Sequence, residues 1–265
     1  LRIDHSILDQ HADSYRKIRN TFRYILGNLN DNFEKIDLEK INLSELPELE
    51  QFMLHKMYSL NKKFKNYFKN YDFHNLYKEL LNFCTVDLSA LYFDIRKDAL
   101  YCDELDSQKR KSTIILLNII LNALLKWFAP ILSFTTEEIF KLISKNDKSI
   151  HLEKFFQFPE SFKNDSLNEK WQDCIKIRNI CNISIEEKRA NKEIGSSLEA
   201  ELKINLNEKF NEVTKNIDFS ELCITSKAIV SFSKTNQVEV NTIKAKGSKC
   251  PVCWKINEEP CPRHS

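Results

Sequence analysis

The stretch from Thr113 to Ser144 constrains the fold of this chain more than any other. Its first half would be apolar on nearly every side of a helix, with only a narrow polar stripe of Asn118, Asn122 and Lys126 at i, i+4 and i+8. The run is short for a bilayer span, contains two amides and a lysine, and stops at a proline. A helix of this kind needs neighbours on most of its surface. The stretch therefore predicts the central helix of a soluble helical bundle.

A second helix is expected directly after that proline. The residues Thr135 to Glu138 have the form of a capping box, in which the Thr135 hydroxyl and the Glu138 carboxylate each bind a backbone N–H at a helix start. The 265-residue chain has only 3 Gly and 6 Pro, which favours long helices over a meander of short strands. The sequence thus predicts a mainly α fold.

A basic ridge follows one side of the first predicted helix, which covers residues 11–29. Its members are Arg16, Lys17, Arg19, Asn20 and Arg23. Guanidinium groups at i, i+3 and i+7 offer planar forks of donors that suit phosphate oxygens. The formal net charge is only +2, so affinity for a polyanion has to come from this arrangement rather than from total charge. A solvated helix face is the alternative interpretation of the same pattern.

Four parts are expected along the chain. Residues 1–145 are predicted to form an antiparallel helical bundle, and 146–169 a polar strap packed on it. Residues 170–245 are predicted to form a small α+β unit, because a helical pattern gives way to period-two alternation and further strand candidates. Residues 246–265 form a cysteine-containing tail.

The tail carries the strongest chemical signal in the sequence. Cys250 and Cys253 form a Cys-x-x-Cys pair, and Cys261 and His264 form a Cys-x-x-His pair seven residues later. Three thiolates and one imidazole suit a tetrahedral zinc ion, and four protein ligands leave no open position, so the zinc would be structural. The alternatives are a redox Cys-x-x-Cys, which lacks a thioredoxin-like context here, and incidental thiols on a frayed tail.

The sequence contains no constellation that indicates catalysis. It has no Gly-rich phosphate loop, no nucleophile elbow and no paired carboxylates in an evident cleft, so no catalytic residue is assigned. The chain opens with Leu1 rather than Met and has no signal-peptide pattern, which suggests a piece of a longer polypeptide. The other five cysteines are scattered without a pairing pattern, as expected in a reducing compartment.

Several segments together resemble the C-terminal part of bacterial isoleucyl-tRNA synthetases, and they cover nearly the whole chain in the family's order. The segments that carry the resemblance are Ser14–Thr21, Gly27–Leu29, Asp94 with Lys97-Asp98, Tyr101–Asp103, Ala129-Pro130, Phe134–Glu138, Ile194–Ala200 and Cys250–Trp254. The family usually ends with a second Cys-x-x-Cys after a longer connection, whereas the last candidate ligand here is His264.

The resemblance implies a class I synthetase whose catalytic and editing domains precede Leu1. ATP and magnesium would be used only in that missing catalytic domain, and this part would be inactive alone. Its expected role is to hold the anticodon arm of isoleucine tRNA through the basic ridge, with Trp254 as a base-stacking platform. The intact enzyme is expected to be a cytoplasmic monomer without membrane contact. The alternative is a free-standing zinc-containing RNA-binding or helical adaptor protein.

Overall fold

The computed structural model describes residues 4–30, 33, 36–144 and 148–264, which form two compact units. The first unit contains the chain up to Leu100 and from Glu104 to Asn164, and the second contains Tyr101–Asp103 and the chain from Asp165 onward. The mainly α class with a small sheet and a C-terminal cysteine cluster is confirmed. The domain boundaries stay predictions, and the one at residue 145 lies outside the described residues.

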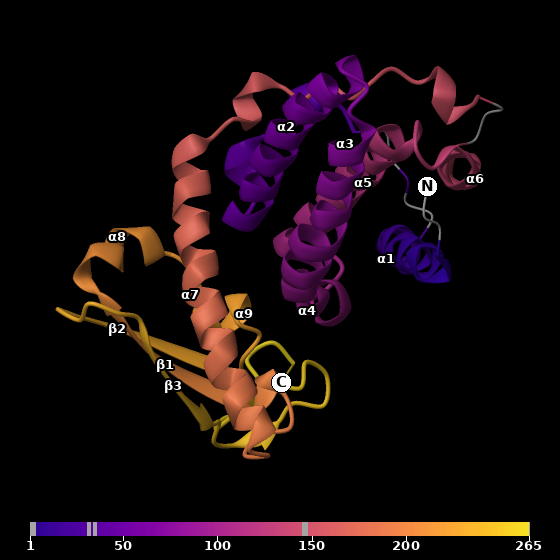
Figure 1. Ribbon diagram of the computed structural model, residues 1–265. Coiled ribbons are helices and arrows are strands. Elements are labelled where there is room, and N and C mark those ends of the chain that lie inside the picture. The colour runs from indigo at the N-terminus through magenta and orange to yellow at the C-terminus, as the bar shows by residue number, and fades with distance from the viewer. Residues whose placement is uncertain (1–3, 31–32, 34–35, 145–147, 265) are drawn as a thin grey trace. The chain divides into compact units, whose positions relative to one another are not determined.

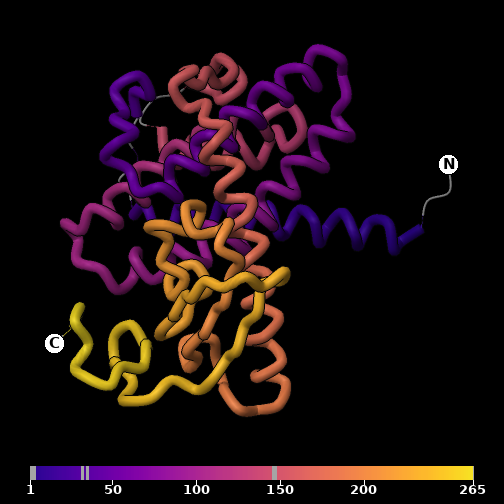
Figure 2. Tube along the Cα trace, turned by 90° about the vertical axis from the view of Figure 1, so that its left-hand side faces the viewer, coloured from indigo at the N-terminus to yellow at the C-terminus, as the bar shows by residue number. Residues whose placement is uncertain are grey.

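The first unit is a bundle of helices (Figure 1). Its helices are α1 (His5–Leu29), α2 (Glu48–Lys69), α3 (Phe73–Asn82), α4 (Asp94–Cys102), α5 (Gln108–Phe128) and α6 (Ser133–Ile143). The last two residues of α4 are counted with the second unit. A π-helix over Phe83–Phe93 joins α3 to α4 without a break. Figure 2 shows the first turns of α1 extending beyond the other helices of this unit, in keeping with the exposure of every residue from 4 to 13.

Helix α5 supplies the core of the bundle, as its composition predicts. The Trp127 ring is fully buried and meets Phe64 edge-on at 5.0 Å between centroids. Its indole N–H donates to the Asn61 side-chain oxygen at 3.0 Å, so the one polar atom of this large side chain is satisfied. Within the described part of the chain α5 is the one helix long and apolar enough to cross a membrane, but most of it is buried in the bundle. We conclude that it is a core helix.

The predicted capping box at Thr135 is wrong. Helix α6 begins two residues earlier, at Ser133, and its N-cap residue Leu132 makes no side-chain capping bond. The chain turns within the Phe128–Leu132 segment, where the Leu132 N–H donates to the Phe128 carbonyl at 2.7 Å. Thr135 therefore already lies inside the helix, and its hydroxyl bonds the Tyr15 hydroxyl of α1 at 2.8 Å instead.

A buried ion pair links α2 to α4. Arg96 donates from Nε and Nη2 to the two carboxylate oxygens of Glu50, each at 2.6 Å, and both side chains are almost fully buried. The Tyr92 hydroxyl, at 3.0 Å, gives the same carboxylate a third hydrogen bond. Both oxygens of the Glu50 carboxylate therefore accept hydrogen bonds at good geometry. A buried ion pair is tolerated under this condition, because the hydrogen bonds offset the cost of removing the charges from water.

The segment after α6 packs on the bundle, as expected for the strap. Asn61 donates to the Phe156 carbonyl at 3.1 Å, and Lys126 of α5 pairs with Glu153 at 3.3 Å. The polar residues of the stripe on α5 therefore have hydrogen-bonding partners. Lys126 pairs with the strap, and the Asn122 side chain donates to the Asn118 carbonyl within the helix.

The second unit contains a three-stranded sheet covered on one face by a long helix (Figure 1). Its elements are α7 (Asp165–Ala190), β1 (Ala200–Asn207), α8 (Asn211–Thr214), α9 (Phe219–Leu222), β2 (Lys227–Ser233) and β3 (Glu239–Lys244). Strand β1 is central, parallel to β2 and antiparallel to β3. Its alternating residues Leu202, Ile204 and Leu206 are buried, which confirms the period-two interpretation.

Candidate zinc centre and RNA-binding surface

A short hairpin at the end of the second unit sets up the cysteine cluster. Strands β4 (Ser248–Lys249) and β5 (Ile256–Asn257) pair antiparallel. Gly247 precedes them with φ +117°, and a Cβ there would lie 2.0 Å from the Asn257 carbonyl oxygen, so only glycine fits this close approach. The Cys250 N–H donates to the Lys255 carbonyl at 2.9 Å, which closes the turn that holds the first cysteine pair.

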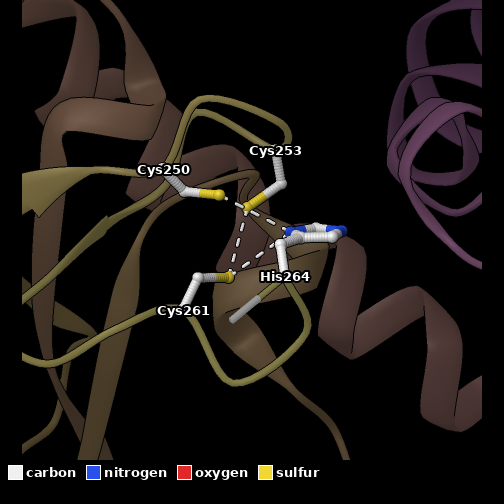
Figure 3. Close-up of side chains that lie close together, drawn as sticks. All are labelled: Cys250, Cys253, Cys261 and His264. Atoms are coloured by element: carbon white, nitrogen blue, oxygen red, sulfur yellow. Dashed lines mark hydrogen bonds between the residues drawn. The ribbon is translucent and has the colours of Figure 1, made fainter.

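The four sequence-predicted ligands converge on one point (Figure 3). One candidate ligand atom from each of Cys250, Cys253, Cys261 and His264 lies within 4.8 Å of the others. The Cys253 and Cys261 sulfurs are 3.8 Å apart, and His264 Nδ1 is 3.5 Å from the Cys250 sulfur and 3.4 Å from the Cys261 sulfur. A tetrahedron with the usual Zn–S and Zn–N bond lengths has edges of about 3.8 Å between sulfurs and about 3.5 Å between sulfur and nitrogen. The residues present therefore fit a zinc ion.

The local backbone favours a thiolate at one of these cysteines. The backbone N–H groups of Cys253 and Val252 lower the pKa of Cys250 to about 6, whereas burial raises the pKa of Cys253 to about 11. A thiolate is the form of cysteine that ligates metals, and a bound cation would favour it at the remaining sulfurs as well. Cys250 is thus the cysteine of this pair that loses its proton more readily before any ion arrives.

A second layer of contacts holds His264, although it is the penultimate residue. Its Nε2 lies 2.9 Å from the Cys102 carbonyl oxygen, within the second unit, and hydrogen bonding to that carbonyl raises its pKa. A proton on Nε2 leaves Nδ1 free to face the sulfurs. Next to it, Arg263 forms an ion pair with Asp103. The imidazole is thus oriented from the side opposite the three thiols.

Sequence reasoning missed Cys102 and Asp103 as parts of this centre. They precede their partners Arg263 and His264 by about 160 positions, and no spacing rule connects such distant residues. The sequence offered only the resemblance around Tyr101–Asp103 as a signal.

Replacing Asp103 by asparagine is expected to weaken zinc binding about threefold, because it breaks the ion pair that anchors Arg263, the neighbour of His264, and a partly exposed pair of this kind contributes up to about 1 kcal/mol. Competition with a chromophoric chelator on the full chain measures the change. Asp173→Asn is the matched control, since Asp173 forms a surface ion pair with Lys176 in the same unit. Equal zinc affinity in both variants would show that the Arg263–Asp103 pair does not orient the ligand.

Trp254 follows the first cysteine pair in a strained conformation. Its φ is +65°, a value that bulky residues rarely adopt, yet 59 % of the side chain is exposed. The Lys249 ammonium lies 5.0 Å from the ring centroid. Glycine would adopt this backbone conformation without strain. The exposed indole can stack on a nucleobase, and the neighbouring Lys249 ammonium can pair with the phosphate of the same nucleotide.

The basic ridge of α1 is exposed along its whole length. Its members Arg16, Lys17, Arg19, Asn20 and Arg23 are all exposed. Arg16 forms an ion pair with Asp13, one turn earlier on the same helix, at 2.5 Å. Such a surface pair is weak and leaves the guanidinium available to a phosphate. Lys17 and Asn20 lie beside the arginines and line a cavity, while the ridge and Trp254 belong to different units.

The helical bundle is of the anticodon-binding type of domain found in tRNA ligases. The family model for the anticodon-binding domain of tRNA ligase matches residues 50–204, more than half of the sequence, and the chain belongs to this family. It is 70 % identical over all 265 residues to the isoleucine–tRNA ligase of Pelagibacter ubique, of which it covers 29 %. It is 36 % identical to the isoleucine–tRNA ligases of Agrobacterium fabrum and Bartonella henselae, with 97 % of the chain and 27 % of each relative covered. The chain thus spans less than a third of the length of these curated relatives.

Proposed function

We propose that the chain is the C-terminal, tRNA-binding part of an isoleucine–tRNA ligase of the cytoplasm. The observation that carries this proposal is the identity of 70 % to such a ligase over the full length of the chain. The intact enzyme joins isoleucine to its tRNA at the expense of ATP. ATP and magnesium act in a catalytic domain outside this chain. In the intact enzyme, which works as a monomer, this chain is continuous with the catalytic and editing domains.

The role of this part is positional. Arg16, Arg19 and Arg23 contact phosphates of the anticodon arm, and Trp254 stacks on a base of its loop. Cys250, Cys253, Cys261 and His264 hold a structural zinc ion, a closed site whose contribution is to fold the tail that presents Trp254. Binding energy from the anticodon arm then places the distant acceptor end in the active site.

A titration across a salt series tests the proposal. We expect isoleucine tRNA to bind more tightly than valine tRNA, with a steep loss of affinity as salt rises. Changing Arg16, Arg19 and Arg23 together to alanine should weaken binding about tenfold or more and reduce the salt slope by about two, because each lost phosphate contact removes about 0.7–0.9 from that slope.

A control variant separates local contacts from net charge. Lys40, Lys176 and Lys215 are exposed and lie outside the ridge, so their joint change to alanine removes the same charge. If this control weakens RNA binding as much as the arginine variant does, the ridge is only a solvated face. Equal binding of both tRNAs by the unmodified chain would overturn recognition of the anticodon arm itself.

A further inference from the structure

A second set of basic residues lies on α2, separate from the ridge of α1. Lys62, Lys65 and Lys69 share one side of the helix at i, i+3 and i+7, and all three are exposed. We call these three residues the lysine face. Between Gln51 and Asn70 the chain contains no acidic residue, so no carboxylate in this part of α2 opposes their charge. The lysine face is therefore a second concentration of positive charge in the first unit.

The lysine face is also not neutralised from neighbouring elements. None of its ammonium groups forms an ion pair with the residues that the structure describes. Their contacts are with neutral groups, such as the Gln157 amide oxygen, to which Lys65 donates at 2.7 Å. The Glu79 carboxylate of α3 is instead paired with Lys63, at 3.5 Å. An anion can thus reach the lysine face without first displacing a carboxylate.

A tyrosine in a strained conformation follows the lysine face at the end of α2. The Asp72 N–H donates to the Tyr67 carbonyl at 2.9 Å, and the Tyr71 N–H donates to the Phe68 carbonyl at 3.2 Å. These two bonds define a Schellman motif, in which Tyr71 occupies the left-handed position with φ +56°. Glycine is the usual residue at this position, because a Cβ strains the left-handed conformation. The tyrosine therefore costs stability that a glycine would not.

Packing does not compensate for this strain. The Tyr71 side chain is 81 % exposed, and its ring meets the Phe73 ring at 6.4 Å between centroids. Phe73 in turn meets Phe68 of α2 at 6.1 Å, so the aromatic pair is attached to the bundle while Tyr71 remains open to solvent. Strained residues that the fold does not need are a feature of ligand sites. An open ring two residues after Lys69 suits a ligand that combines a flat face with negative charge.

We propose that the lysine face and Tyr71 form a second RNA-contact surface, on which an unpaired stretch of RNA places its phosphates along the lysines and stacks one base on Tyr71. The inference rests on the proposed function, which supplies the RNA, and it adds a site outside the ridge of α1 and the cysteine-containing tail. RNA fits better than an acidic peptide, because an open aromatic face accepts any base and a lysine contacts a phosphate as a point charge. A base must be unstacked to reach the ring, so the surface favours single strands over duplex.

Tyr71→Gly separates an RNA contact from a structural role. The substitution relieves the backbone strain, so we expect the melting temperature to rise by about 2–4 °C. Affinity for isoleucine tRNA should nevertheless fall about tenfold at an unchanged salt slope, because a stacked base is lost and no phosphate contact is. Tyr71→Trp keeps an aromatic ring and should bind within about twofold of the unmodified chain. A glycine variant that is more stable and binds RNA normally would overturn the stacking contact.

The joint change of Lys62, Lys65 and Lys69 to alanine tests the phosphate contacts. We expect affinity for isoleucine tRNA to fall about tenfold and the salt slope to decrease by about two, because each contact with a single strand contributes about 0.7 to that slope. The triple-lysine control used for the basic ridge removes the same charge at other exposed positions. An equal loss of affinity in that control would show that net charge, and not the lysine face, is responsible.

A short oligouridine tests the surface without tRNA. Ultraviolet light cross-links uridine to aromatic side chains that it contacts, and mass spectrometry of the digested chain locates the adduct. We expect an adduct at Tyr71 that weakens in the lysine variant, while the peptide from Tyr71→Gly carries none. This result supports the surface even if the chain does not prefer isoleucine tRNA, in which case the proposed function fails alone. If tRNA binding depends on the ridge of α1 while both variants bind normally and no adduct forms, the second surface is wrong and the proposed function stands.

Discussion

Replacing Glu50 by alanine is expected to lower the free energy of unfolding of the helical bundle by about 3–5 kcal/mol. The substitution leaves the Arg96 guanidinium buried without the two 2.6 Å bonds that its partner supplied. It also removes the acceptor of the Tyr92 hydroxyl, a group whose pKa burial already raises well above its usual value. Chemical denaturation followed by circular dichroism measures the loss.

A double variant separates the cost of an unpaired charge from the value of the pair. Changing Glu50 to leucine together with Arg96 to methionine removes both charges and keeps most of the volume, so we expect it to recover most of the lost stability. Tyr92→Phe in that background removes the hydroxyl that would otherwise lack its acceptor. A double variant as unstable as the single one would show that the ion pair itself, rather than its disruption, determines the stability.

The second large effect is expected at the candidate zinc centre. Cys250→Ser should reduce bound zinc from about one ion per chain to almost none, because a structural site needs all four ligands. The backbone N–H of Trp254 donates to the Cys250 carbonyl at 3.0 Å, in the turn that the ion would close. Affinity for isoleucine tRNA should therefore fall about tenfold as the indole loses its position. Elemental analysis and the tRNA titration measure the two effects.

Cys223→Ala is the matched control for this variant. Cys223 is buried in the same unit but lies outside the cluster, so its loss should leave zinc content unchanged. Treatment of the unmodified chain with a strong chelator should reproduce the Cys250→Ser result, and added zinc should reverse it. Full tRNA affinity in the zinc-free chain would show that the tail does not contact RNA.

Patterns with a short period could be read directly from the sequence. The near-continuous apolar run of α5 predicted a helix buried on all sides, and the alternation from Leu198 to Leu206 predicted a half-buried strand. The four candidate zinc ligands were also found this way, because each pair lies within one turn of chain. In all three cases the physical constraint acts between residues a few positions apart.

Local motifs failed where a distant partner competed for the same group. Thr135 to Glu138 satisfied the capping-box pattern, but the chain reversal after Phe128 starts the helix early and the Thr135 hydroxyl bonds Tyr15 instead. The pattern describes which hydrogen bonds are available to a side chain. Which bond forms depends on the atoms that packing brings near.

The sequence by itself determined the helical class of this protein, its central helix and the four residues of its candidate metal centre, because local spacing specifies each of them. Only the tertiary structure decided that Cys102 and Asp103 support His264, that Glu50 and Arg96 form a closed pair, and that α1 and the π-helix enclose a cavity. These features join residues that are distant along the chain. Their contacts arise only when the buried faces of the helices pack, and no local pattern encodes which side chains then meet.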